Sequence, residues 1–368
     1  MSSQSSMICI AGGGTGGHVM PALALADAVR LQWSGLKVHF IGAERGLEAT
    51  LLPERGEEVL LLNMHAVQGV GLLQRLRVIG LELPFAVFKI MRVWRKEKPR
   101  VLVGVGGYAS VAGVIAALLS RIPVVLYEQN AIPGMVNRIL YRFCNQMMLG
   151  FASAEQHLPH THKSVVTGNV VRQAITAVKY QLADKPCLLV MGGSQGAMFL
   201  NQTVPLACVK LAQQGLDFSV IHLVGAGDGR VAQVKAMYED AGIDADVQAY
   251  SSDMPGLFAQ ASLMVARSGA MTVCEAAAVG MPCFFVPLPW AADNHQYYNA
   301  KVLADAGAAK ILNQDTCDET LLALKLSKTL CHPSKLKNMH TQARNVFVGD
   351  AAALQLQVLQ AFVGEVKS

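Results

Sequence analysis

Three glycine-rich segments each stand between an apolar run that predicts a strand and a segment that predicts a helix. They are residues 12–18, 192–197 and 267–272. The backbone N–H groups of such a loop and the positive end of the following helix together suit a phosphate. One loop alone is weak evidence, because tight turns that let a helix pack closely on a strand have the same composition. Three of them in one chain predict a nucleotide or diphosphate ligand.

Two side chains beside these loops could take part in chemistry. His18 ends the first loop, and an imidazole titrates near neutral pH, which makes His18 a candidate general base rather than only a polar cap. Thr272 and Glu275 have the spacing of a capping box, in which Thr272 caps a helix and Glu275 bonds back to it. In a binding site, the Glu275 carboxylate would instead accept hydrogen bonds from two ribose hydroxyls. The spacing alone favours the cap.

Several kinds of chemistry find little support in the sequence. It contains no GxxxxGK[ST] motif, which excludes a P-loop NTPase. A dinucleotide fold needs an acidic residue after its second strand, and Glu44 lies near that place, so an NAD oxidoreductase stays open. We expect no obligatory protein-bound metal and no cofactor. Its eight cysteines form no CxxC pair, which is typical of buried thiols in a reducing compartment.

The order of predicted elements indicates two α/β halves that begin alike. Strands at 7–11 and 187–191 each lead through a glycine loop into a helix, at 19–31 and 198–213 respectively. The join falls near residues 168–172. The uncharged stretch 101–120 is long enough to span a membrane, but its glycines favour a buried strand followed by a helix. The N-terminus has no pattern of a signal peptide, so we expect a cytoplasmic protein.

The basic excess of the chain is concentrated in one segment. Residues 75–100 hold eight Lys and Arg against Glu82 and Glu97, and the segment also contains Leu76, Phe85 and Phe88. An ordinary core helix with a solvated basic face would have this composition. The alternatives are a patch that meets anionic lipid and a nucleic-acid surface, for which no known binding module is present.

Taken together, the motifs resemble the MurG family of UDP-N-acetylglucosamine transferases over nearly the whole chain. The resemblance is carried, in order and spacing, by residues 12–18, Tyr127-Glu128-Gln129-Asn130, Gly168-Asn169 with Arg172, residues 192–197, residues 267–272 with Glu275, and Asp293-Asn294-His295-Gln296. Each piece alone is common, whereas the combination is specific.

The resemblance implies a GT-B fold, in which two Rossmann-like α/β domains with parallel sheets face a cleft. Residues 1–170 would form an acceptor- and membrane-facing domain, residues 171–348 a UDP-sugar domain, and residues 349–368 a helix returning to the first domain. The donor would be UDP-N-acetylglucosamine and the acceptor lipid I, an undecaprenyl diphosphate carrying N-acetylmuramoyl-pentapeptide. The product would be lipid II, formed with inversion at the sugar. The enzyme would act at the cytoplasmic face of the inner membrane, bound to its anionic surface. No nucleic acid would be involved.

The resemblance also implies roles for individual residues. His18 would be the base, with Glu128 as an alternative base or as the group that orients it. Thr15, Gly16 and Gly17 would contact the donor sugar or its diphosphate, and Asn130 would bond to the N-acetylglucosamine. Arg172 and Ser194 would bind the diphosphate side. Ala270, Met271 and Thr272 would present a helix N-terminus to the phosphates, with Val273 and Cys274 next to them in the substrate site. Glu275 would hold the ribose, Gln296 would meet the sugar hydroxyls, and Ser251 would lie beside the uracil. Ser251, beside the uracil, is the least secure of these.

The sequence departs from the family pattern at three positions. Tyr127 stands where His is frequent, Val170 where Pro is frequent, and Gln68 in a loop that usually carries Arg. The last leaves the acceptor diphosphate without an assigned partner there. The rival functions are another GT-B transferase, such as one acting on a diacylglycerol-type lipid, a UDP-sugar epimerase, and a regulator that binds a UDP-sugar without turnover.

Overall fold

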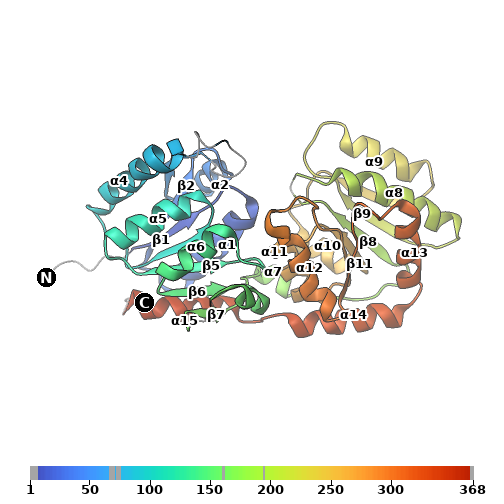
Figure 1. Cartoon of the computed structure of the whole chain (residues 1–368). Helices are drawn as coiled ribbons and strands as arrows, with labels where there is room; N and C mark the ends of the chain where they lie inside the picture. Colours follow the sequence, from blue (N-terminus) through green and yellow to red (C-terminus); the bar gives the residue numbers. More distant parts are fainter. Residues whose placement is uncertain (1–6, 66–70, 72–75, 160–161, 194, 365–368) are drawn as a thin grey trace. The chain divides into compact units, whose positions relative to one another are not determined.

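The computed structural model describes residues 7–65, 71, 76–159, 162–193 and 195–364. The chain divides into two compact units (Figure 1). Unit 1 comprises Met1–Val170 together with Asp350–Ser368, and unit 2 comprises Val171–Gly349. Each unit is an α/β domain built on one parallel sheet, as the order of predicted elements indicates.

Unit 1 contains a seven-stranded sheet in the order β3-β2-β1-β4-β5-β6-β7. All of its pairings are parallel. The strands are β1 (Met7–Gly12), β2 (Lys37–Ala43), β3 (Val59–Leu62), β4 (Leu102–Gly106), β5 (Val124–Glu128), β6 (Gln146–Leu149) and β7 (Ser164–Val166). The stretch 101–120 is therefore a buried strand followed by a helix, and the membrane-span interpretation of it is wrong.

Helices cover both faces of this sheet. They are α1 (Gly16–Gln32), α2 (Glu48–Glu54), the π-helix η1 (Val78–Glu82), α4 (Leu83–Trp94), α5 (Tyr108–Leu119), α6 (Met135–Leu140), the 3₁₀ helices η2 (Tyr141–Phe143) and η3 (Ala152–His157), and α15 (Ala351–Val363). Side chains of β1 alternate between two cores. Met7 and Cys9 pack in the core that includes α4 and α5, whereas Ile8 and Ile10 pack in the core that includes α1 and α15.

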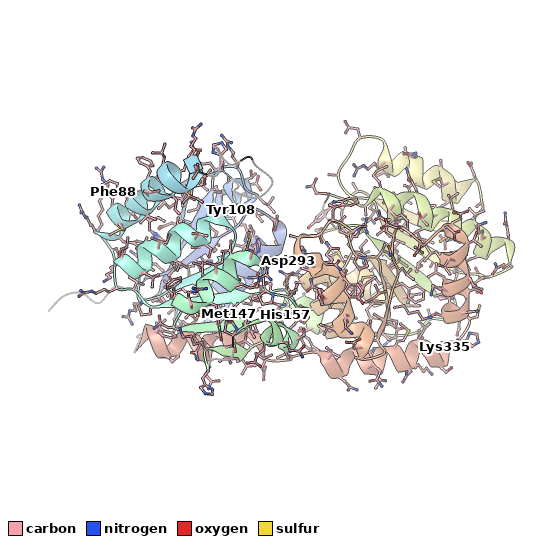
Figure 2. All side chains as sticks on the ribbon, in the orientation of Figure 1. Phe88, Tyr108, Met147, His157, Asp293 and Lys335 are labelled. Atoms are coloured by element: carbon pink, nitrogen blue, oxygen red, sulfur yellow. The ribbon has the colours of Figure 1, made fainter. Side chains whose placement is uncertain are left out.

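Helix α4 has one buried and one exposed face. Ile90 and Trp94 are buried in the core of unit 1. Phe85 and Phe88 are on the other side of the helix, with 70% and 57% of their surface exposed, and Figure 2 shows the Phe88 side chain on α4. The segment 75–100 is therefore more than an ordinary core helix, because large apolar groups remain in contact with solvent.

Unit 2 contains a six-stranded parallel sheet in the order β10-β9-β8-β11-β12-β13. Its strands are β8 (Cys187–Met191), β9 (Ser219–Leu223), β10 (Asp244–Gln248), β11 (Leu263–Ala266), β12 (Cys283–Phe285) and β13 (Ala309–Ile311). Its helices are α7 (Gln173–Thr176), α8 (Met198–Gln213), α9 (Arg230–Glu239), α10 (Met254–Gln260), α11 (Ala270–Val279), the 3₁₀ helix η4 (Ala292–Asn294), α12 (His295–Asp305), α13 (Glu319–Leu330) and α14 (Pro333–Val346).

Two helices begin earlier than the sequence predicts. Helix α1 begins at Gly16 instead of residue 19, because the left-handed backbone is confined to Gly12, Gly13 and Gly14 and has ended before Gly16. Helix α11 begins at Ala270 instead of Thr272. In both places, residues assigned to a loop belong to the first turn of a helix, where backbone N–H groups have no intrahelical partner.

Candidate active site

Both units have the same strand order, and in each sheet the direction in which successive strands are added reverses at one point. In unit 1 this point lies between β1 and β4, and in unit 2 it lies between β8 and β11. Open α/β sheets bind ligands outside the carboxyl ends of their strands at such a point. The predicted glycine loops follow β1, β8 and β11, so all three lie at that edge of their sheets.

The first loop presents the beginning of α1. Thr15 is the N-cap residue with extended backbone, and its carbonyl accepts from the N–H groups of His18 and Val19 at 3.1 and 3.2 Å. Gly16 and Gly17 are therefore the first two residues of the helix. The hydroxyl of Thr15 lies 3.4 Å from Nδ1 of His18, whose side chain is half-buried. The predicted base thus stands on the first turn of a helix.

A second glycine pair, which the sequence did not identify as part of a site, packs against the first loop. Gly106 and Gly107 follow β4 and precede α5, and both have positive φ. A Cβ on Gly107 would lie 2.5 Å from the Gly13 carbonyl oxygen, and one on Gly106 would lie 2.9 Å from Nε2 of His18. The starts of α1 and α5 therefore lie next to each other, which gives unit 1 two helix N-termini at one edge.

Glu48 is a buried carboxylate beneath this loop that the sequence analysis did not find. It is fully buried, and its two carboxylate oxygens accept hydrogen bonds from the N–H groups of Gly14 (2.7 Å) and Ala43 (2.9 Å). A Cβ on Gly13 would lie 2.2 Å from the Glu48 carboxyl group, so only glycine fits there. Glu44, the candidate for a dinucleotide ribose, is exposed to solvent.

Glu128 organises the segment that carries Asn130. One carboxylate oxygen accepts from the backbone N–H (2.9 Å) and the side-chain amide (3.1 Å) of Asn130, and the other accepts from Gly134 and Asn137. The carboxylate is almost fully buried. Four donors at these two oxygens favour the orienting role for Glu128 over that of a base.

The departure at Tyr127 has a local structural explanation. Its hydroxyl donates to Oδ1 of Asn169 at 2.8 Å, and Asn169 Nδ2 donates to the Gln129 carbonyl at 2.9 Å. Tyr127 and Asn169 are both buried. Part of the motif that carried the family resemblance therefore fixes the backbone before Asn130.

In unit 2, the loop after β8 leads into α8 and packs on the segment after β9. Ser194 lies outside the described residues. Its neighbour Gln195 offers a carbonyl that accepts from Nη1 of Arg230 at 2.8 Å. A Cβ on Gly196 would lie 2.1 Å from the Val224 carbonyl oxygen, so glycine is required where these segments cross.

The capping-box prediction for Thr272 and Glu275 is wrong. Gly269 is the N-cap residue of α11, and Thr272 is the third residue of the helix, because Ala270 already has helical backbone. Ala270, Met271 and Thr272 therefore supply the N–H groups of the first turn. Val273 and Cys274 are buried, so a ligand at this edge would meet them only through the backbone.

Glu275 lies one turn further along α11 and faces Arg172. The distance from Arg172 Nη2 to Glu275 Oε1 is 3.4 Å, and the two side chains are 51% and 14% exposed. Burial raises the pKa of Glu275 above that of an ordinary glutamate, and the positive charge of Arg172 opposes this shift. The structure brings these two predicted site residues together within unit 2.

Two buried side chains, Arg267 and Asn299, fix the loops of unit 2. The sequence analysis assigned neither of them a role. The Arg267 guanidinium donates to the carbonyls of Val286 (2.9 Å) and Pro287 (3.2 Å) and to Oε1 of Gln314 (2.6 Å). Burial lowers the pKa of Arg267. Asn299 donates to the Ser268 carbonyl at 3.2 Å, which ties α12 to the start of α11.

Gln296 is the second residue of α12. Oε1 of Gln296 accepts from the Leu288 N–H at 3.0 Å, which fixes the orientation of its amide. Asp293 and Asn294, just before the helix, both have left-handed backbone (φ 51° and 53°), and Figure 2 labels the Asp293 side chain. Consecutive non-glycine residues in this region are strained, and such strain concentrates at functional sites.

Ser251 follows β10, at the same sheet edge as the glycine loops, and its Oγ accepts from the Asp253 N–H at 3.2 Å.

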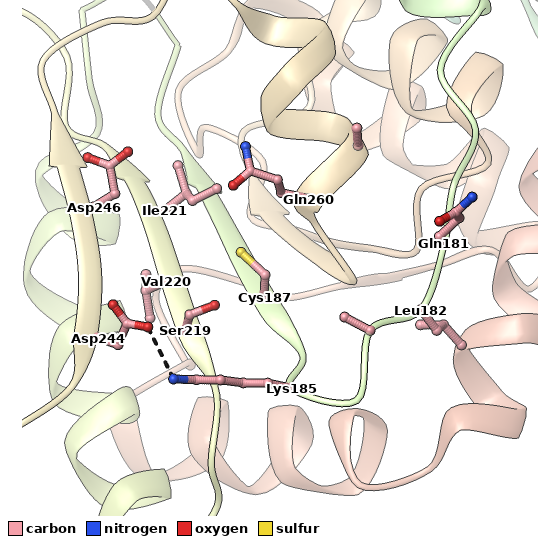
Figure 3. Close-up of a pocket in the computed structure, with 12 residues that line it drawn as sticks. Gln181, Leu182, Lys185, Cys187, Ser219, Val220, Ile221, Asp244, Asp246 and Gln260 are labelled. Atoms are coloured by element: carbon pink, nitrogen blue, oxygen red, sulfur yellow. Dashed lines mark hydrogen bonds and ion pairs between the residues drawn. The ribbon is translucent and has the colours of Figure 1, made fainter.

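A cavity of about 460 Å³ lies at the opposite edge of the sheet of unit 2, where Cys187, Ser219 and Asp244 begin β8, β9 and β10 (Figure 3). No predicted site residue lines it. Within the described ranges, no cluster of three or more His, Cys, Asp or Glu could hold a metal.

The chain is similar to glycosyltransferases along nearly its whole length. Residues 8–149 match the glycosyltransferase family 28 N-terminal domain, and residues 187–355 match the family 28 C-terminal domain. The UDP-N-acetylglucosamine--N-acetylmuramyl-(pentapeptide) pyrophosphoryl-undecaprenol N-acetylglucosamine transferase of Aeromonas hydrophila is 39% identical over 352 residues, covering 95% of this chain and 94% of that protein.

Solved structures show the same relationship. The crystal structure of Acinetobacter baumannii MurG superposes with a TM-score of 0.81 at 33% identity and covers 98% of this chain and 100% of that chain. Phytolacca americana UGT2, complexed with UDP-2fluoro-glucose and pterostilbene, has a TM-score of 0.71 at 11% identity, with 98% of this chain and 100% of that chain covered. The latter likeness concerns the fold alone. The expected GT-B architecture of two parallel-sheet α/β domains is confirmed.

Proposed function

The chain belongs to glycosyltransferase family 28, and we propose that it catalyses the reaction for which its close relatives are named. It transfers N-acetylglucosamine from UDP-N-acetylglucosamine to the muramoyl 4-hydroxyl of lipid I, an undecaprenyl diphosphate, and forms lipid II with inversion. The observation that carries this proposal is the 39% identity to a named transferase along 95% of the chain. We assign the acceptor and the membrane to residues 1–170 with the helix 349–368, and the donor to residues 171–348.

The donor half of the proposal rests on α11. The N–H groups of Ala270, Met271 and Thr272 meet the phosphates of UDP, Arg172 adds a full positive charge, and Glu275 accepts from the ribose hydroxyls. Gln296, whose amide is oriented by Leu288, meets the sugar hydroxyls. Ser251 lies beside the uracil, and Ser194 on the diphosphate side remains a prediction.

The other half of the proposal, the base and the contacts to the donor sugar, rests on the starts of α1 and α5. Thr15, Gly16 and Gly17 meet the sugar of the donor, and Asn130, held by Glu128, bonds to the same N-acetylglucosamine. His18 takes the proton of the acceptor hydroxyl while that oxygen forms its bond to the anomeric carbon. The bond from the anomeric carbon to UDP breaks in the same step, and UDP leaves with the electron pair. General-base catalysis of this kind contributes about 10²–10⁴-fold.

No metal is part of the proposed mechanism. The negative charge that develops on the leaving phosphate is met by the first-turn N–H groups of α11 and by Arg172. Helix dipoles contribute only about 0.3–1 kcal/mol each at exposed positions, so the full charge of Arg172 is needed beside them.

Membrane attachment is proposed for the exposed side of η1 and α4. This lipid-facing patch is defined here as Leu76, Ile79, Leu81, Phe85 and Phe88, each more than half exposed, with the exposed Arg77, Arg92, Arg95 and Lys96 nearby in the chain. Apolar side chains enter the headgroup layer, while each basic residue adds about 1 kcal/mol at an anionic surface. The attachment is peripheral, on the cytoplasmic face of the inner membrane, and involves no nucleic acid.

The membrane proposal is tested with vesicles. Replacing Arg92, Arg95 and Lys96 by Gln removes three charges, or about 3 kcal/mol, which corresponds to roughly 10²-fold weaker binding to anionic vesicles at low salt. Phosphatidylcholine vesicles serve as the control surface. Equal binding of the triple variant and the parent protein to anionic vesicles would remove this patch from the proposal.

The catalytic proposal is tested by UDP release from UDP-N-acetylglucosamine with and without a lipid I analogue. We expect release that depends on the acceptor, with UDP-N-acetylgalactosamine a much poorer donor. The variant His18→Ala should bind UDP normally and lose turnover, which would also exclude a regulator without catalysis. Donor binding without release would point to another acceptor, such as a diacylglycerol-type lipid, and tight NAD binding without UDP binding would overturn the proposal.

A further inference from the structure

The two units place opposite charges against equivalent glycine loops, a buried one in unit 1 and a half-buried one in unit 2. In each unit, the strand that pairs with the first strand is followed by a helix. The first residue of that helix forms a hydrogen bond with the backbone of the glycine loop. In unit 1 this neighbour is β2, the helix is α2, and its first residue is Glu48. In unit 2 the neighbour is β9, the helix is α9, and its first residue is Arg230. The two positions are topologically equivalent, but their charges are reversed.

Glu48 makes the loop of unit 1 less suited to a nucleotide diphosphate. Its carboxylate accepts from the Gly14 N–H at 2.7 Å, so one loop amide is already used by the protein. The group is fully buried and lies against Gly13 and Gly46, where a Cβ would come within 2.2 Å of it. A buried carboxylate beneath the loop repels a phosphate at the same amides.

Arg230 has the reverse effect on the loop of unit 2. Its guanidinium donates to the Gln195 carbonyl at 2.8 Å, so it takes up an acceptor of the loop instead of an amide. The side chain also packs on Gly227, where a Cβ would lie 2.5 Å from Nε. A positive charge is therefore held behind the loop at the edge where the UDP diphosphate binds in the proposed function.

We propose that this reversed pair decides which glycine loop takes the UDP diphosphate. Arg230 is a positioning residue for donor binding in unit 2. Glu48 is a positioning residue that fixes the loop before Thr15 and His18 and keeps the nucleotide diphosphate away from unit 1. The inference rests on the proposed function, because it assigns the donor to unit 2 and the base to unit 1.

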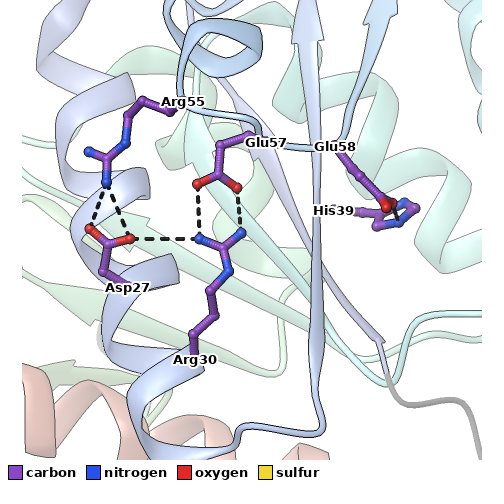
Figure 4. Close-up of polar contacts among 6 residues, drawn as sticks. All are labelled: Asp27, Arg30, His39, Arg55, Glu57 and Glu58. Atoms are coloured by element: carbon purple, nitrogen blue, oxygen red, sulfur yellow. Dashed lines mark hydrogen bonds and ion pairs between the residues drawn. The ribbon is translucent and has the colours of Figure 1, made fainter.

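Helix α2 has other contacts that keep it in place when Glu48 is changed. Arg55, which follows α2, pairs with Asp27 of α1 at 3.1 Å, and Glu57 accepts a two-pronged hydrogen bond from Arg30 of α1 (Figure 4). A substitution that keeps the volume of Glu48 therefore tests its acceptor and its charge instead of the packing of α2.

The first arm of the experiment concerns Arg230. The variant Arg230→Gln should bind UDP roughly tenfold more weakly in titration calorimetry, because a loop hydrogen bond from a charged group is lost. Arg230→Lys retains a charged donor and should recover most of that affinity. Lys235→Gln is the matched control, since Lys235 is on the same helix and pairs with the exposed Glu239. We expect kcat of all three to stay close to that of the parent protein at saturating donor.

The second arm concerns Glu48. The variant Glu48→Gln keeps the shape but offers one acceptor to two N–H groups, so the loop before His18 shifts. A shift of about 1 Å costs on the order of 10²-fold in kcat, whereas UDP affinity in the other unit should stay within about twofold. Glu54→Gln, an exposed change on the same helix, is the control. Faster hydrogen exchange of the Gly14 amide in Glu48→Gln checks the geometry without an activity assay.

The two arms change different parameters: the Arg230 variant should change UDP affinity, and the Glu48 variant should change kcat. A loss of UDP affinity with Arg230→Gln and a loss of kcat with Glu48→Gln would support the inference. The inference would be overturned if both variants changed the same parameter, or if neither variant changed UDP affinity or kcat. If Glu48→Gln does not fold, unaltered UDP affinity of Arg230→Gln still overturns it. Absence of turnover in the parent protein would instead count against the proposed function, while the calorimetric and exchange measurements still judge the inference.

Discussion

Replacing Glu275 by Gln tests the donor site at its most specific contact. The carboxylate stands on α11, 14% exposed, with Arg172 3.4 Å away. A hydrogen bond to a charged group contributes about 1.5–3 kcal/mol net, and an amide oxygen can replace only one of the two ribose contacts without charge. The variant Glu275→Gln should therefore bind UDP about 10–100-fold more weakly.

The pH dependence of UDP binding gives a second, independent signature. Burial raises the pKa of Glu275, with Arg172 in opposition, so its carboxylate is protonated at a higher pH than an exposed glutamate. In the proposed complex the ionised form accepts from the ribose, so we expect UDP affinity to be present above the raised pKa and to be lost as the pH falls through it. The effect on folding has the opposite sign. Ionising Glu275 destabilises the folded state as the pH rises from the ordinary glutamate pKa through the raised one.

Calorimetric titration with UDP across the acidic range separates these effects. The parent protein should lose affinity on acidification, whereas Glu275→Gln should start weaker and respond much less over the same range. Arg172→Gln removes the opposing charge, so its loss of affinity should begin at a higher pH. Equal UDP affinity of Glu275→Gln and the parent protein, or an unaltered acidic limb in that variant, would refute the assignment of the ribose to Glu275.

Two further substitutions test how the structure positions the site. Gly106→Ala puts a Cβ 2.9 Å from Nε2 of His18 at a φ of +100°, so turnover should fall about tenfold or more while UDP affinity in the calorimeter stays unchanged. Arg267→Met removes the donor to the carbonyl of Val286 and to Gln314, and urea denaturation should show a loss of about 3 kcal/mol; a loss below about 1 kcal/mol would contradict the role given to this buried guanidinium.

The architecture could be predicted from the sequence because its signals are local. Apolar runs ending in glycine loops indicated the strands β1 and β8, and the structure has them at Met7–Gly12 and Cys187–Met191. The helix starts were wrong because composition does not distinguish a glycine with left-handed backbone from one in a helix. Gly12 to Gly14 are of the first kind, while Gly16 belongs to α1.

The groups that hold the site together could not be predicted in the same way. Glu48 bonds to Gly14 across 34 residues, and Arg230 bonds to Gln195 across 35. Neither lies in a motif, and an isolated Glu or Arg before a helix is usually solvated. Their partners follow from the strand order, which places the end of β2 beside β1 and the end of β9 beside β8, and that order is a property of the folded sheet.

The Arg172–Glu275 pair indicates how two charged side chains of the proposed donor site are accommodated before the donor binds. At 3.4 Å and with Arg172 half-exposed, the pair is long and screened by water on its arginine side, so it contributes only about 0–1 kcal/mol. UDP can therefore separate the two at small cost. In the proposed complex the arginine then meets the diphosphate and the glutamate meets the ribose, so each partner exchanges a weak contact for a charge-assisted one. A ligand that offers only one of these groups would leave the other side chain without a partner, so the pair selects for a ribose and a diphosphate presented together.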